Sequence, residues 1–402
     1  SLRISIVVPA YRTKKEHLEE MLNSVSKQSY SHWELIVADA GGTAESVQAW
    51  AKKNGICLRE AADASNLAEW KDQSIVLSTL SENKGISANT NAGIELAAGD
   101  AVGLLDHDDL LTANALWEMA DCLEKEKKRG KQKLVLFSDE DKCDGAASRF
   151  YEPNFKPDFD GELLLTNNYI CHFTVIETAF LKELKLRSGF DGAQDYDLML
   201  RAYAAGGQFV HVPKVLYHWR CHEASTASNP QSKRYAYEAG QRALEDYCLR
   251  KGWKATVSGL KHLGFYREDY EDSVFCQRPE IGIWAKPLPG GRDIFGIRHP
   301  KGFLVSGLYE NDGLMRYAGL RKGYSGPMHR AALQQSAPAA DLRSMEVCSA
   351  LKERYAQTIA ELKEACQGLP TAAQETKILQ KSMEFCKEAT AAGYGILWDP
   401  QA

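Results

Sequence analysis

The alternation of apolar runs and helical patterns over the first 106 residues constrains the fold most. Four runs have the composition of buried strands: ISIVVPA (4–10), WELIVADA (33–40), QSIVLSTL (73–80) and AVGLLD (101–106). Helical patterns separate them, at 17–29, about 44–54 and 85–99. Apolar strands separated by helices are typical of a mostly parallel sheet in an α/β fold. Ligands of such sheets bind at the carboxyl ends of the strands.

From about residue 112 the pattern changes. We predict three helices (112–131, 194–207, 232–251) and three strands (133–142, 167–176, 208–220). The acidic stretch REDYED (267–272) marks the expected domain boundary. We therefore predict one domain over 1–265, with halves 1–110 and 111–265, and a second, α/β or mainly helical domain over 266–402, with helices at 341–390.

Composition limits the kinds of partner. The net charge of −5 gives no general attraction to nucleic acid or to anionic lipid, so an anionic ligand needs local groups or a metal. Ten scattered cysteines without a CxxC pair indicate reduced thiols in a cytoplasmic protein. No apolar run approaches the roughly 18 residues of a membrane span. Strand-like residues directly at the start and just before Pro400 favour a chain cut from a longer one.

The stretch GDAVGLLDHDDLL (99–111) runs from a strand into clustered carboxylates. Asp106 and Asp108 are two residues apart at the strand end, so both can face one divalent cation while His107 points elsewhere. Few, hard oxygen ligands suit Mg²⁺ or Mn²⁺. The alternative is an acidic turn in which Asp109 or Thr112 caps the next helix.

Six segments together resemble glycosyltransferase family 2. They are ISIVVPAY, WELIVADAGG, NKGISANTNAGIELAAGD, LLDHDDLL, QDYDLMLR and LYHWR, in the order and spacing of that family over about residues 3–265. SDEDK (138–142), NNYICHFTV (167–175) and HWR look like the branch that builds bacterial surface polysaccharides and glycoprotein glycans. The resemblance implies an inverting enzyme with a GT-A fold, which pairs a nucleotide-binding half with an acceptor-binding half.

The resemblance also implies a nucleotide-sugar site. Pro9 and Tyr11 would flank the base, and Asp39 would accept its N3–H; as alternatives, they are a strand terminator, a rim aromatic and a turn residue before Gly41. A second group would approach the ribose and diphosphate at a helix N-terminus: Lys84, Gly85 and Asn89. A glycine at a helix start is equally an ordinary helix start.

Asp195 is the candidate general base that the resemblance implies, although Gln194 replaces the usual Glu before it. Its alternative role is that of a helix N-cap. Asp197, four residues before Arg201, has the spacing of a helix-surface ion pair.

His218 in LYHWR matches a position at which relatives supply a late histidine to the metal or diphosphate. A core histidine beside Trp219 is the alternative. Arg220 would neutralise the diphosphate, or pair with Glu223 instead. Asp106 would then serve both the donor and, with Asp108 and His218, the metal.

Together these features predict a metal-dependent hexosyltransferase. It would move a sugar from a UDP- or dTDP-sugar to a glycan, glycoprotein or lipid-linked acceptor at the inner face of the bacterial membrane. Residues 266–402 would form a degenerate second module for acceptor binding or homo-oligomerisation. The alternative is a non-catalytic module that binds nucleotide or glycan. A nucleotidyltransferase would need a glycine-rich loop after the first strand, where this chain has PAYRTKK.

Overall fold

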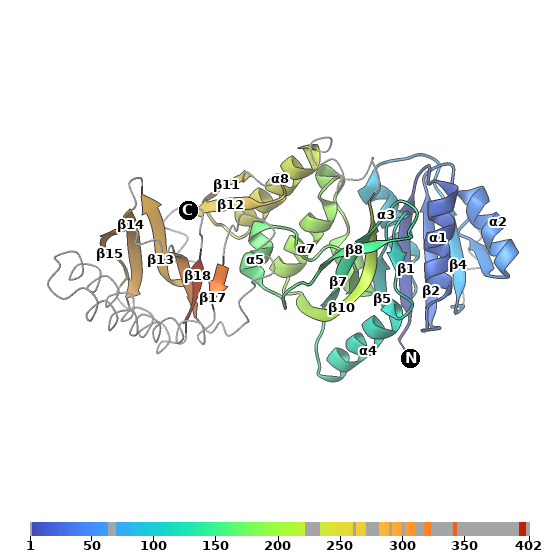
Figure 1. Cartoon of the computed structure of the whole chain (residues 1–402), viewed down its shortest axis with the longest axis horizontal. Coiled ribbons are helices and arrows are strands. Elements are labelled where there is room, and N and C mark those ends of the chain that lie inside the picture. Colours follow the sequence, from blue (N-terminus) through green and yellow to red (C-terminus); the bar gives the residue numbers. More distant parts are fainter. Residues whose placement is uncertain are drawn as a thin grey trace. The chain divides into compact units, whose positions relative to one another are not determined.

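The computed structural model describes residues 2–62, 70–221, 234–259 and 263–270, together with six strands between 281 and 398 (Figure 1). The chain divides into two compact units, Ser1–Lys251 and Gly252–Ala402. The functional division at 265/266 stays a prediction. No helix among the described residues is long and apolar enough to cross a membrane.

The first unit is built on a ten-stranded sheet. Its first half contains five neighbouring parallel strands, in the spatial order β3 (Cys57–Glu60), β4 (Ser74–Thr79), β2 (Trp33–Asp39), β1 (Ile4–Ala10) and β5 (Ala101–Leu104). β1, β2, β4 and β5 lie within the predicted runs. β3 was not predicted, because its burial is partial and its sequence, CLRE, is polar at its end.

The second half continues the same sheet. Its members are β9 (Thr174–Glu177), β7 (Leu134–Cys143), β10 (Gln208–Arg220), β6 (Leu110–Leu111) and β8 (Phe150–Asn154). β9 runs antiparallel between β5 and β7, and β10 is parallel to β7. β6 and β8 pair antiparallel with β10 and β7. The expected α/β fold with a mostly parallel sheet is therefore confirmed.

Helices cover both faces of this sheet (Figure 1). One face packs against α1 (Lys15–Ser26), α2 (Ala44–Asn54) and α4 (Ala115–Lys128) through a continuous apolar core. α3 (Ile86–Leu96) packs on the opposite face of β1 and β2, where Gly93 permits close approach: a Cβ there would lie 2.7 Å from Val7 Cγ1. The remaining helices follow in chain order: α5 (Gly161–Thr166), α6 (Thr178–Leu184), the 3₁₀ turn η2 (Ser188–Phe190), α7 (Gln194–Ala204) and α8 (Arg234–Arg250).

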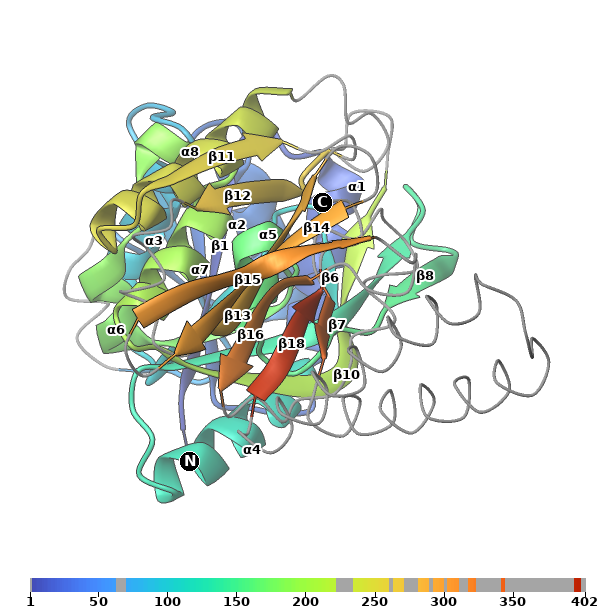
Figure 2. The same cartoon turned by 90° about the vertical axis from the view of Figure 1, so that its left-hand side faces the viewer.

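Described residues of the second unit form two antiparallel sheets. β11 (Ala255–Gly259) pairs with β12 (Tyr266–Tyr270), so most of the acidic stretch at the expected boundary lies in a strand. The larger sheet has the order β15 (Gly302–Glu310), β14 (Arg292–His299), β13 (Ile281–Leu288), β16 (Tyr317–Lys322), β18 (Tyr394–Trp398) and β17 (Asp341–Arg343). Figure 2 labels all of these strands except β17. Of the helices predicted over 341–390, only residues 341–343 are described, and they form the strand β17 instead, paired with β18. The rest of that prediction lies outside the described residues.

Candidate active site

A cleft opens at the carboxyl ends of β1 and β5. Pro9 at the end of β1, Asp106 after β5 and Asp195 at the start of α7 all line it. The segment before β9 closes one side with Cys171 and His172. The empty space of the cleft is about 660 Å³ when its solvent-filled mouth is included. Three residues predicted from separate segments thus meet in one cavity.

The acidic loop after β5 is tied to the strand β10. Asp109 is 1 % exposed and accepts hydrogen bonds from the Tyr217 hydroxyl at 2.5 Å and the Arg220 backbone N–H at 2.7 Å. The sequence predicts Asp109 as a helix cap at most, but its carboxylate faces β10 instead. The loop geometry that presents Asp106 to the cleft therefore depends on residues more than a hundred positions later.

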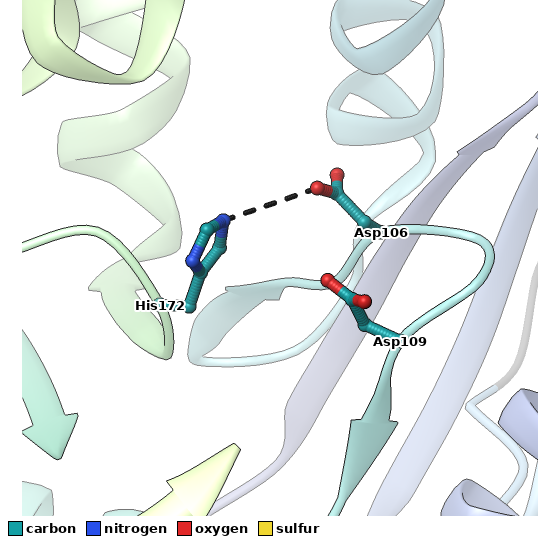
Figure 3. Close-up of side chains that lie close together, drawn as sticks. All are labelled: Asp106, Asp109 and His172. Carbon is teal, nitrogen blue, oxygen red and sulfur yellow. Dashed lines mark ion pairs between the residues drawn. The ribbon is translucent and has the colours of Figure 1, made fainter. Parts of the chain in front are cut away.

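His172 brings an imidazole to this loop. One donor atom from each of Asp106, Asp109 and His172 lies within 4.8 Å of the other two, as Figure 3 illustrates. His172 Nε2 lies 3.9 Å from Asp106 Oδ2, and its ring stacks on Tyr217 with centroids 4.8 Å apart. This arrangement places a nitrogen donor next to two carboxylates. The carboxylates suit Mn²⁺ and Mg²⁺, whereas imidazole is the more usual ligand of softer divalent metals.

Two charged residues, Glu140 and Lys156, also contact His172. Glu140 Oε2 lies 3.4 Å from His172 Nδ1, and Lys156 Nζ lies 3.3 Å from the same oxygen. The Lys156 ammonium also donates to the carbonyl oxygens of Ile170 at 3.1 Å, Cys171 at 2.8 Å and His172. Lys156 thus fixes the backbone of the histidine, and the Glu140 carboxylate lies beside its Nδ1, where carboxylates behind metal-bound histidines are found.

Protonation equilibria in the cluster are shifted. Burial, together with the Asp106 and Asp108 carboxylates, raises the pKa of Asp109 well above its ordinary value. Desolvation and the neighbouring Asp108 and Asp195 raise the pKa of Asp106. Burial disfavours the His172 imidazolium, but Cys171 and Glu140 outweigh it and raise the pKa of His172 well above 6.5. The carboxylates repel one another, so a divalent cation would relieve that repulsion and displace protons.

Asp195 opens α7 and faces the cleft. Its Oδ2 accepts a 2.8 Å hydrogen bond from the Asn168 side-chain amide. The cap position before this helix belongs to Ala193, without a side-chain cap hydrogen bond. Asp197 does pair with Arg201, at 2.9 Å, but this pair is buried rather than on the surface. Arg187 also binds Asp197.

Two of the predicted metal and diphosphate residues are engaged elsewhere. His218 Nδ1 contacts Asp141 Oδ1, and its ring lies 4.3 Å from that of Phe150. Arg220 is 1 % exposed and holds the Asp108 and Gly145 carbonyls and the Glu20 carboxylate. A guanidinium enclosed by these partners points into the protein rather than to a ligand, and Glu223 lies outside the described residues. Asp108 stands beside Asp106 in the loop but not in the close cluster of Figure 3.

The predicted base-binding residues lie at the ends of β1 and β2. Asp39 is buried, and its two oxygens accept the backbone N–H groups of Gly41, Thr43 and Ala44 at 2.8–3.2 Å. This geometry fits the alternative turn role and neutralises the start of α2. Tyr11 is 39 % exposed, and the Arg12 guanidinium lies 5.0 Å from its ring centroid. The ring remains accessible to a planar ligand.

The three predicted diphosphate residues gather at the start of α3. Asn89 Oδ1 accepts the Lys84 backbone N–H, and Gly85 has a φ of 95°, which favours glycine. Asp191 reaches this helix end from before α7: its carboxylate accepts the Ser87 N–H at 3.3 Å. A Cβ at Gly85 would come within 2.3 Å of Asp191 Oδ2. A carboxylate from the second half therefore already occupies part of the helix N-terminus.

Three residues of the site were missed from the sequence: Asp109, Asn168 and His172. NNYICHFTVI is predicted as one strand, yet only its last residues belong to β9. Two adjacent asparagines and a histidine in an otherwise apolar segment were the available signal that the backbone there forms a loop.

Comparisons with known proteins identify a family and several relatives. Residues 5–184 match the family model described as Glycosyl transferase family 2. The uncharacterized protein y4gI of Sinorhizobium fredii is 37 % identical over 255 residues, which is 63 % of this chain and 26 % of that protein. The O-antigen biosynthesis protein RfbC of Myxococcus xanthus is 35 % identical over 256 residues, 63 % of this chain and 19 % of RfbC. The amylovoran biosynthesis glycosyltransferase AmsB of Erwinia amylovora is 28 % identical over 232 residues, 54 % of this chain and 70 % of AmsB. The chain thus spans only 26 % of the length of the first relative and 19 % of the second.

Proposed function

We propose that this chain transfers a sugar from a nucleotide donor to a hydroxyl group of a glycan acceptor, because residues 5–184 belong to glycosyltransferase family 2. The observation that carries the proposal is the shared cleft of Pro9, Asp106 and Asp195 at the carboxyl ends of β1 and β5. The relatives named for O-antigen and amylovoran biosynthesis support a bacterial surface polysaccharide as the acceptor class.

In this proposal Asp195 is the general base. Its carboxylate takes the proton of the attacking acceptor hydroxyl, whose oxygen then bonds to the anomeric carbon of the donor sugar. The bond from that carbon to the diphosphate breaks, and the nucleoside diphosphate leaves. One displacement without an enzyme nucleophile inverts the anomeric centre. Pro9 and Tyr11 would hold a uracil or thymine base at the end of β1.

Mn²⁺ or Mg²⁺ fits the acidic loop. Asp106, Asp109 and His172 would hold it, with Asp106, Asp108 and His218 as the alternative set. When bound, the cation neutralises charge on the departing diphosphate. Calorimetric titration of Mn²⁺ into His172→Ala and His218→Ala distinguishes the sets. If the first set holds the cation, Mn²⁺ binds about ten-fold or more weakly to His172→Ala, as expected for a lost ligand, and normally to His218→Ala. If the second set holds it, only His218→Ala binds Mn²⁺ more weakly.

The decisive test is nucleoside diphosphate release. Wild type, Asp195→Asn and the matched control Asp158→Asn, whose side chain is 77 % exposed, are assayed with UDP- and dTDP-hexoses. Each reaction contains an acceptor extract and Mn²⁺, Mg²⁺ or EDTA. We expect metal-dependent release that falls at least about 100-fold in Asp195→Asn alone. Full turnover by Asp195→Asn refutes the assigned base.

The same assay separates the alternative function. A chain that binds nucleotide in calorimetry but releases no product from any donor is a nucleotide-binding module rather than a transferase. The cluster of Asp106, Asp109 and His172 beside Asp195 favours the transferase, because a binding module needs no proton acceptor in its cleft.

A further inference from the structure

We infer that Asn168 is a positioning residue for the Asp195 carboxylate: its side-chain amide fixes one oxygen of the base so that the other faces the acceptor. This inference rests on the proposed function. It adds a role to a residue in NNYICHFTV that the sequence placed in a strand. The structure instead places Asn168 in the loop between α5 and β9.

The contact itself is well defined. Asn168 Nδ2 donates to Asp195 Oδ2 at 2.8 Å. Because an ionised carboxylate only accepts hydrogen bonds, the Asn168 atom that faces it must be the nitrogen. The bond engages Oδ2, so Oδ1 is the oxygen that takes the acceptor proton. The side-chain oxygen of Asn168, Oδ1, is buried and has no hydrogen-bond partner in the described part of the protein. An unpaired buried polar atom costs free energy, and the 2.8 Å bond from the other end of the amide to Asp195 offsets part of that cost.

Both partners are anchored to the same pair of helices. The Tyr196 hydroxyl, next to Asp195 on α7, donates to the Leu164 carbonyl of α5 at 2.6 Å. Gly161 lets the start of α5 approach α7, since a Cβ there would come within 2.3 Å of the Tyr203 hydroxyl. The segment that follows α5 is therefore held against the first turn of α7, and the amide and the carboxylate keep their relative positions.

The chemistry of an amide suits this place. Asp195 lies close enough to Asp106 for its carboxylate to disfavour the charged form of Asp106. A third carboxylate at position 168 would add repulsion, whereas a lysine or arginine would form an ion pair and reduce the basicity of Asp195. A neutral amide orients the base without neutralising it.

The test compares Asn168→Ala with the matched control Asn167→Ala. Asn167 is the adjacent asparagine, is 8 % exposed, and also has a side-chain oxygen without a hydrogen-bond partner in the described residues. In the release assay we expect Asn168→Ala to lower kcat about 10- to 100-fold, a fraction of what a general base contributes. The KM for the donor should stay within about two-fold, and kcat of Asn167→Ala within about two-fold of wild type. A kcat of Asn168→Ala within two-fold of wild type overturns the inference.

A double-mutant cycle separates positioning from a general structural effect. If Asn168 acts through Asp195, Asn168→Ala causes no further loss in the Asp195→Asn background. An equal loss in both backgrounds overturns the inference. Asn168→Asp, which keeps the side-chain shape, replaces Asn168→Ala if that variant does not fold, and should lose at least as much activity. Wild-type protein that is inactive with every donor refutes the proposed function instead, and this role with it.

Discussion

Lys156 offers the sharpest quantitative test of the structure around His172. Its side chain is 1 % exposed, and its ammonium lies among the Glu140 carboxylate and the carbonyl oxygens of Ile170, Cys171 and His172. Lys156→Met keeps the length and the apolar stem of the side chain but removes the charge and every hydrogen bond of the ammonium group. Glu140 and three carbonyl groups then remain buried without their cation.

The expected cost is large. Removal of one partner from a buried ion pair typically destabilises a protein by about 3–5 kcal/mol, because the other charge stays desolvated. A typical domain has only about 5–15 kcal/mol of unfolding free energy. We therefore expect Lys156→Met to lose about a fifth or more of the stability of the first unit. At about 2–4 °C per kcal/mol for a unit of this size, its unfolding temperature falls by roughly 6–20 °C.

The assay is urea unfolding of the full chain, followed by tryptophan fluorescence. Lys142→Met is the matched control from the same hairpin, since Lys142 is one third exposed and pairs with the exposed Glu152 at 2.6 Å. That pair should contribute less than about 1 kcal/mol. The double variant Lys156→Met/Glu140→Gln should recover part of the loss, because no uncompensated charge remains. Equal, small effects of Lys156→Met and Lys142→Met would refute the buried-pair interpretation.

Two further predictions concern titration. Burial alone would raise the pKa of Asp246, but hydrogen bonds from Arg187 and Arg250, both at 2.7 Å, lower it. Its stabilising effect is therefore present above pH 4 and lost as the pH falls through the folded-state pKa. Asp246→Asn should cost about 1–2 kcal/mol at pH 7 and progressively less as the pH falls below 4, measured by unfolding across pH, and a pH-independent difference would contradict this. Burial raises the pKa of the Cys143 thiol to about 12. Iodoacetamide at pH 8 should thus label the exposed Cys57 but not Cys143 in native protein, as peptide mass spectrometry would show.

The parallel half of the fold could be read from the sequence because each strand is an apolar run bounded by polar residues. The strand 4–10 and the helix 44–54 have the predicted limits. The signal weakens where burial is partial, as in β3, or where a strand has two residues, as in β6. Local pattern cannot identify such edge strands, since their pairing partners hold them in place.

The site was only partly predictable for a similar reason. Asp106 and Asp195 follow a strand and open a helix, positions that local pattern identifies, and they do share a cleft. Arg220 and His218 lie on β10, where the choice between ligand and internal partner depends on what the neighbouring strands present. His172 precedes a reversed strand, so a search restricted to residues that follow parallel strands passes it by.

The position of β9 has a consequence for motion. β9 joins β5 of the first half to β7 of the second through continuous backbone hydrogen bonds, so one sheet runs through both halves of the first unit. Hinge closure, in which two lobes swing about a few linker residues, would break this ladder. We therefore expect the loops at the strand ends, rather than the two halves of the sheet, to move when a ligand enters the cleft.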